Sequence, residues 1–131
     1  MTRGKLSPLL WLWTTGALAG LVWGIGAVVV ASIAPPQYIP RVFFSYHIEH
    51  FAIFYLIAIL AAAGLPTIRL HQVACVLVLM AFVLATVRLT IPRHRLSDAE
   101  DLAADVAGIA AALAPMVLGR LRYIAAQART G

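Results

Sequence analysis

Residues 93–108 read RHRLSDAEDLAADVAG, and this polar stretch lies between two apolar segments. It contains four of the chain's five acids, two of its ten lysines and arginines, and one of its four histidines. The flanking sequence is almost entirely apolar. Whether the last helix begins within this polar stretch or after it therefore decides if that helix is long enough to cross a membrane, and with it the fold. The acids are Asp98, Glu100, Asp101 and Asp105.

The composition is typical of a membrane protein. Hydrophobic residues make up 63% of the 131 residues, charged residues 11%, and the mean hydropathy is +0.93; soluble domains are about 25% charged. The net charge of +5 does not indicate nucleic-acid binding, because the basic residues are scattered at the ends of apolar runs. A single cysteine, Cys75, excludes an intrachain disulfide.

The apolar runs predict an all-α, polytopic membrane protein: one domain, residues 1–131, with four transmembrane helices in an up-down bundle. The helices are expected at about 9–34, 46–65, 72–91 and 98–119, each near the roughly 20 residues that cross a bilayer. The first run is too long for a signal peptide, so we expect a retained helix. Prolines follow the first three helices. The tail, with Arg120, Arg122, Tyr123 and Arg129, is expected to be a frayed amphipathic end.

The start of the fourth helix is marked by a capping pattern. Ser97 is followed three residues later by Glu100, and Asp98 in the first turn suits the positive end of the helix dipole. A start at Asp98 gives a helix long enough to cross the bilayer and places Asp105 inside it. Ser97 and Glu100 are therefore predicted to be structural.

Glycine recurs at every fourth position of the first helix, at Gly16, Gly20 and Gly24. This spacing lines one helix face with small residues and permits another backbone to approach closely. We expect this face to pack against another helix of the same chain in preference to a second copy.

Lysine and arginine counts predict the orientation. With the N-terminus in the cytoplasm, six of the ten basic residues and none of the acids lie inside, which obeys the positive-inside rule. Both termini are then cytoplasmic. With four crossings, the first and third loops share the outer side, so the cluster of His47, Glu49 and His50 should face the same compartment as residues 93–105.

Two blocks of residues resemble the VanZ-like family of bacterial membrane proteins. The first block is Glu49, His50 and Phe54; the second is Pro92, Arg95, Asp101, Asp105 and Gly108, so that the resemblance covers about residues 45–115. It implies a cell-envelope protein of the bacterial inner membrane, in a family named for a relative linked to teicoplanin resistance. The family's Glu-x-x-Gln at the end of the third helix is absent, and Arg88 lies there instead.

Arg88 is predicted to be structural and paired. An ionised side chain inside a transmembrane helix costs about 2.5–3.5 kcal/mol at mid-bilayer, so a partner is expected. Glu49 and Asp105 are the candidates. Gly108 lies on the same face of the fourth helix as Asp101 and Asp105, and is also expected to serve packing.

The candidate ligand-binding residues are Glu49, His50, Arg95, Asp101 and Asp105. Arginine can hold a phosphate or carboxylate, and an Asp–His pair can orient a proton. A metal held by His47, His50, Asp101 and Asp105 is conceivable, but the spacing matches no dedicated metal motif, so neither a metal nor another cofactor is expected.

Three functional classes remain open. The first is an envelope protein that binds or shields an anionic or lipid-linked ligand, such as a cell-wall precursor, at the outer face among membrane lipids. The second is a membrane enzyme acting on a lipid head group, with His50 and Asp101 as acid and base. The third is a small transporter, which would need an acid deeper in a helix than Asp105.

Overall fold

The computed structural model describes residues 8–34, 38, 45–90 and 98–130, and the described part folds into four helices. They are α1 (Pro8–Ile33), α2 (Tyr46–Gly64), α3 (Leu70–Leu89) and α4 (Asp98–Thr130). Each is long and apolar enough to cross a membrane. The predicted all-α, four-helix membrane architecture is confirmed.

The helix ends agree with the sequence prediction within two residues, except at the end of α4. α3 begins two residues early, where the Gln72 side-chain oxygen accepts a hydrogen bond from the Arg69 backbone N–H at 3.2 Å. It ends at Leu89 instead of residue 91, and Pro92 disfavours helical backbone at the residue before it.

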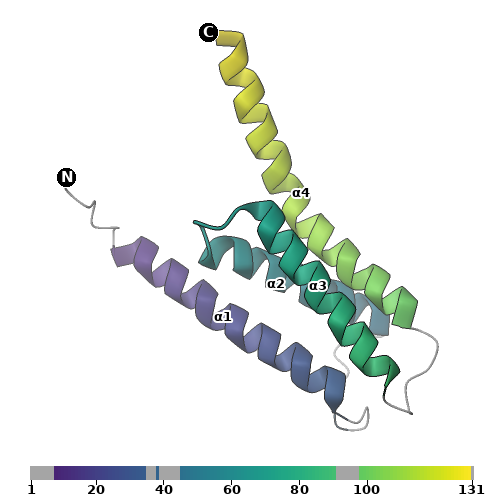
Figure 1. Ribbon diagram of the computed structural model, residues 1–131. Coiled ribbons are helices and arrows are strands. Elements are labelled where there is room, and N and C mark those ends of the chain that lie inside the picture. Colours follow the sequence, from purple (N-terminus) through teal and green to yellow (C-terminus); the bar gives the residue numbers. More distant parts are fainter. Residues whose placement is uncertain (1–7, 35–37, 39–44, 91–97, 131) are drawn as a thin grey trace.

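The prediction that the C-terminal tail frays is wrong. α4 continues from Gly119 to Thr130 without a break, giving a helix of 33 residues that also contains Pro115. The added segment contains three alanines, three arginines, one leucine and one glutamine, all of them strong helix formers. Figure 1 shows this end of α4 projecting beyond the other three helices.

The helices form an up-down bundle in which α2 lies between α1 and α4 (Figure 1). The most extensive contact is between α2 and α4, followed by those of α1 with α2 and of α3 with α4. The C-terminal ends of α1 and α3 therefore lie at the same end of the bundle as the N-terminal ends of α2 and α4. Buried apolar side chains connect the helices, among them Val28, Phe54, Ile57, Leu77, Leu84, Ile109 and Leu113.

Gly108 allows α4 to lie against the backbone of α2. A Cβ atom at this position would collide with the carbonyl oxygen of Phe51 and would lie 3.0 Å from the backbone nitrogen of Tyr55. Both obstacles are backbone atoms, which cannot rotate away as a side chain can. The absence of a side chain at Gly108 therefore sets how closely α2 and α4 approach.

The predicted glycine face of α1 packs against α2 over part of its length. Cβ atoms at Gly20 and Gly24 would lie 3.3 Å and 3.2 Å from the side chains of Leu60 and Ile57. Gly16 has no heavy atom within 4 Å of such a position. Within the described residues, only the C-terminal part of this glycine face, at Gly20 and Gly24, therefore serves helix packing.

Candidate functional site

A buried hydrogen bond connects His50 of α2 to Asp105 of α4. The His50 Nδ1 atom lies 2.8 Å from Asp105 Oδ1, and both residues are more than nine-tenths buried. The ring of Tyr46, one turn earlier on α2, packs against the His50 ring with 4.7 Å between centroids. The histidine-bearing turn of α2 thus faces the acidic turns of α4, at the common end of the bundle where the crossing count places both.

A second histidine and two acids extend this contact toward the exposed end. His47 Nδ1 lies 2.9 Å from Asp101 Oδ1, and His47 Nε2 lies 3.2 Å from Glu100 Oε2. A neutral imidazole can donate from only one nitrogen, so both contacts are hydrogen bonds at once only when His47 is protonated. Asp101 is 2% exposed, whereas the Glu100 side chain is 75% exposed, so the chain of contacts runs from the surface into the bundle.

Arg88, in the last turn of α3, occupies the centre of the cluster. Its Nη2 donates to the hydroxyl of Ser32 on α1 at 2.9 Å, and its Nη1 lies 3.3 Å from His50 Nε2. Arg88 also approaches the carboxylate of Asp101, with 4.0 Å between Nη1 and Oδ2. Arg88 is 5% exposed, and its Nε–H has no hydrogen-bond partner among the described residues.

The contact with Arg88 assigns the tautomer of His50. A guanidinium has only donors, so His50 Nε2 must be the acceptor and carries no proton. The ring proton is then on Nδ1 and is donated to Asp105. In this arrangement, Asp105 orients a neutral imidazole whose basic nitrogen is covered by Arg88.

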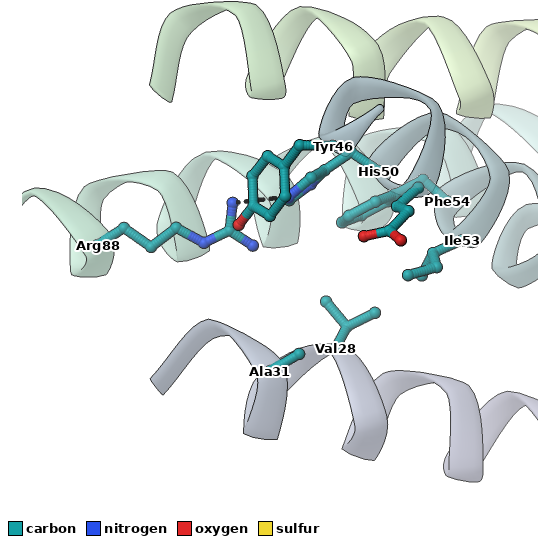
Figure 2. Close-up of a pocket in the computed structure, with 8 residues that line it drawn as sticks. Val28, Ala31, Tyr46, His50, Ile53, Phe54 and Arg88 are labelled. Carbon is teal, nitrogen blue, oxygen red and sulfur yellow. Dashed lines mark hydrogen bonds between the residues drawn. The ribbon is translucent and has the colours of Figure 1, made fainter. Parts of the chain in front are cut away.

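A small pocket of about 60 Å³ lies beside these residues, between α1 and α2. Figure 2 shows the Arg88 guanidinium reaching toward the His50 ring, with Val28 and Ala31 of α1 on the opposite side. Apolar side chains form most of its surface, and its polar groups come from α2 and α3. The lining residues are Val28, Ala31, Tyr46, Glu49, His50, Ile53, Phe54 and Arg88.

The structure brings together most of the residues predicted from the sequence. His50 and Asp105 form one hydrogen-bonded pair and Asp101 pairs with His47, while Arg88 contacts His50 and approaches Asp101 at 4.0 Å. Glu49 lines the adjoining pocket. Glu100, predicted to cap α4, places its carboxylate against His47. Arg95 and Ser97 lie outside the described residues, so the predicted Arg95 contact and the Ser97 cap stay predictions.

The predicted partners of Arg88 need correction. Glu49 and Asp105 were expected, but Arg88 approaches Asp101 and reaches Asp105 only through His50. Ser32, also bonded to the Val28 carbonyl at 2.7 Å, was missed as a member of the site. A serine near the end of an otherwise apolar helix, three residues before a proline pair, is the sequence signal that could have indicated it.

The cluster lacks the arrangement of a metal centre. Among the described residues, no three His, Cys, Asp or Glu side chains are grouped so that they could hold a metal ion. Each histidine nitrogen in the cluster already faces a carboxylate or the guanidinium. The cluster offers a guanidinium, that of Arg88, for charge recognition and an imidazole, that of His50, for proton transfer.

Comparison of the chain with protein-family models, with curated proteins and with solved structures finds no match.

Proposed function

We propose that this protein binds the anionic head group of a membrane amphiphile, such as a lipid-linked phosphate, in the pocket beside Arg88. The observation that carries the proposal is a buried guanidinium at a pocket, whose Nε–H has no hydrogen-bond partner in the described part of the chain. A buried donor without a partner costs about 1–3 kcal/mol, and a ligand oxygen would remove this cost. The planar fork of arginine matches the oxygens of a phosphate or carboxylate.

The shape and lining of the pocket favour an amphiphile over a water-soluble anion. Val28, Ala31, Ile53 and Phe54 supply an apolar surface that suits hydrocarbon. The Arg88 guanidinium lies on the same lining. It would take the anionic group, and the apolar side chains would take the chain of the ligand.

The same proposal places the protein in the bacterial inner membrane as a VanZ-like protein, with the pocket at the extracytoplasmic face. Support comes from the resemblance of Glu49, His50, Asp101, Asp105 and Gly108 to the family pattern, and from the positive-inside count. A cell-wall precursor carried on a lipid phosphate fits this location. Glycopeptide susceptibility is the associated phenotype that the resemblance implies.

Head-group binding can be measured directly on the purified protein in detergent. Native mass spectrometry should detect one bound undecaprenyl phosphate, and no complex with undecaprenol, which has the same hydrocarbon without the phosphate. Arg88→Gln should weaken binding about tenfold to a hundredfold, because a hydrogen bond to a charged group contributes about 1.5–3 kcal/mol. Arg88→Lys should be intermediate, since it keeps the charge and loses the fork.

Arg69→Gln serves as the control for this measurement. It removes an exposed charge at the other end of α3 and keeps the backbone N–H that bonds Gln72, so it should bind as the parent does. Equal binding of undecaprenol, or unchanged binding by a folded Arg88→Gln protein, would contradict the proposal.

The orientation gives a separate prediction. A reporter fused after residue 40 or after residue 96 should lie outside the cytoplasm, and a reporter fused to either terminus should lie inside it. The reason is that more of the Lys and Arg residues lie on the side of the bundle that holds both termini. Paired phosphatase and fluorescent-protein reporters distinguish the two compartments. A cytoplasmic signal after residue 40 or 96 would place the pocket on the inner face and exclude an extracytoplasmic ligand.

A second candidate function, catalysis on the bound head group, is favoured by the 2.8 Å contact of Asp105 with His50. An acid that orients a histidine is the arrangement of a general base. The acid that contacts His50 is Asp105, whereas Asp101, the acid/base candidate from the sequence, contacts His47. His50 Nε2 accepts from Arg88, so it becomes available to take a proton when a ligand draws Arg88 away. His50→Asn should then bind the lipid phosphate but release no product, whereas unchanged turnover would exclude this role.

A further inference from the structure

Helix α4 is longer than a membrane crossing requires, and the excess lies at its C-terminal end. A helix of 33 residues extends about 50 Å at 1.5 Å per residue, whereas the hydrocarbon core of a bilayer is about 30 Å thick. The polar contacts of Asp101 and Asp105 hold the first two turns near one surface. The last dozen or so residues therefore lie beyond the hydrocarbon core at the opposite end of the bundle.

No helix of the bundle covers this segment. Every residue from Val117 to Arg129 is exposed, and the last buried residue of α4 is Leu113. Figure 1 shows the segment standing clear of α1, α2 and α3. It carries large apolar side chains outside the core, with Leu121 57% and Ile124 60% exposed.

The residues of the segment are divided between two faces at helical spacing. One face carries Val117, Leu121, Ile124 and Ala128, spaced four, three and four residues apart. The three arginines lie on either side of this apolar face, and Tyr123 and Gln127 lie on the polar side, hydrogen-bonded to each other at 2.8 Å. The segment contains no acid; its arginines are Arg120, Arg122 and Arg129.

We propose that residues 117–130 lie along the membrane surface and bind anionic lipid head groups, at the end of the bundle opposite the Arg88 pocket. Apolar side chains flanked by arginines suit the boundary between acyl chains and head groups, with the guanidinium groups reaching phosphates. The segment is already tethered to the bilayer by the rest of α4, so no separate association step is needed. A protein partner would have to compete with this adjacent surface.

Pro115 and Gly119 supply the bend that the proposal needs. Proline lacks the N–H that would bond the carbonyl of Ala111, and glycine adds backbone freedom, so the helix can turn here at low cost. The buried contacts of α4 with the bundle lie before this point, at Ile109, Ala112 and Leu113. The last three turns can therefore reorient without changing the polar cluster.

Spin labels at two matched alanines can test this in the full-length protein. In a Cys75→Ala background, Ala128→Cys places a nitroxide on the apolar face and Ala126→Cys places one on the polar side. In liposomes containing phosphatidylglycerol, access of a water-soluble nickel reagent should be several-fold lower at 128 than at 126. This difference should vanish in pure phosphatidylcholine, and in the Arg120→Gln, Arg122→Gln, Arg129→Gln triple variant.

Other outcomes would overturn the proposal. High nickel access at both positions in anionic liposomes would mean that the helix projects into water. Low access of both nickel and oxygen at 128 would indicate burial against protein, such as a second copy. A difference that persists in phosphatidylcholine and in the triple variant would exclude recognition of anionic head groups.

Discussion

Replacing Gly108 with alanine should strongly reduce the stability of the folded protein. The new methyl group would meet the Phe51 carbonyl oxygen and the Tyr55 backbone nitrogen, so α2 and α4 must separate. Overpacking of this kind costs about 1–3 kcal/mol, and more where backbone must move. The same separation would lengthen the His50–Asp105 and His47–Asp101 contacts, which lie in the same helix interface.

Gly16→Ala is the matched control. The same substitution there has no heavy atom within 4 Å, so it should leave stability unchanged or raise it by up to about 1 kcal/mol through better helix propensity. Thermal unfolding in detergent, followed by the fraction that remains monodisperse on size exclusion, compares the two variants. Equal stability of the Gly108→Ala and Gly16→Ala proteins would mean that α2 and α4 are not in backbone contact.

Arg88→Leu should be among the most destabilising substitutions in the polar cluster. It leaves the buried carboxylates of Asp101 and Asp105 without the guanidinium, and breaking a buried charge pair costs about 3–5 kcal/mol. The double variant Arg88→Leu, Asp101→Asn removes one charge of each sign. Its total loss should be smaller than the sum of the two single losses by about 0.5–3 kcal/mol.

Glu100→Gln tests whether the coupling is specific to the buried acids. Glu100 is exposed and contacts His47, so its combination with Arg88→Leu should be close to additive. Unfolding midpoints of the single and double variants in one detergent give both comparisons. Additive losses for Arg88 with Asp101 would exclude the 4.0 Å approach as an energetic contact.

The sequence predicts the positions of the helices because the bilayer leaves little choice. About 20 apolar residues are needed for each crossing, and prolines with polar clusters mark the boundaries. It also predicts that His50 and Asp105 lie at one end of the bundle, since four crossings return the first and third loops to the same side. The end of α4 could not be predicted in this way, because the length of one crossing sets a minimum for the helix and no maximum.

The amino-acid sequence by itself therefore determined the helix number, the common end at which the polar residues gather and the faces they occupy. The tertiary structure alone decided that His50 pairs with Asp105 and that His47 pairs with Asp101. It also decided that Ser32 accepts a hydrogen bond from Arg88, and that Gly108, not Gly16, lies against the backbone of a neighbouring helix. The physical reason is that helical periodicity places a residue on a face. The rotation and axial offset between two helices follow from how all their side chains pack together.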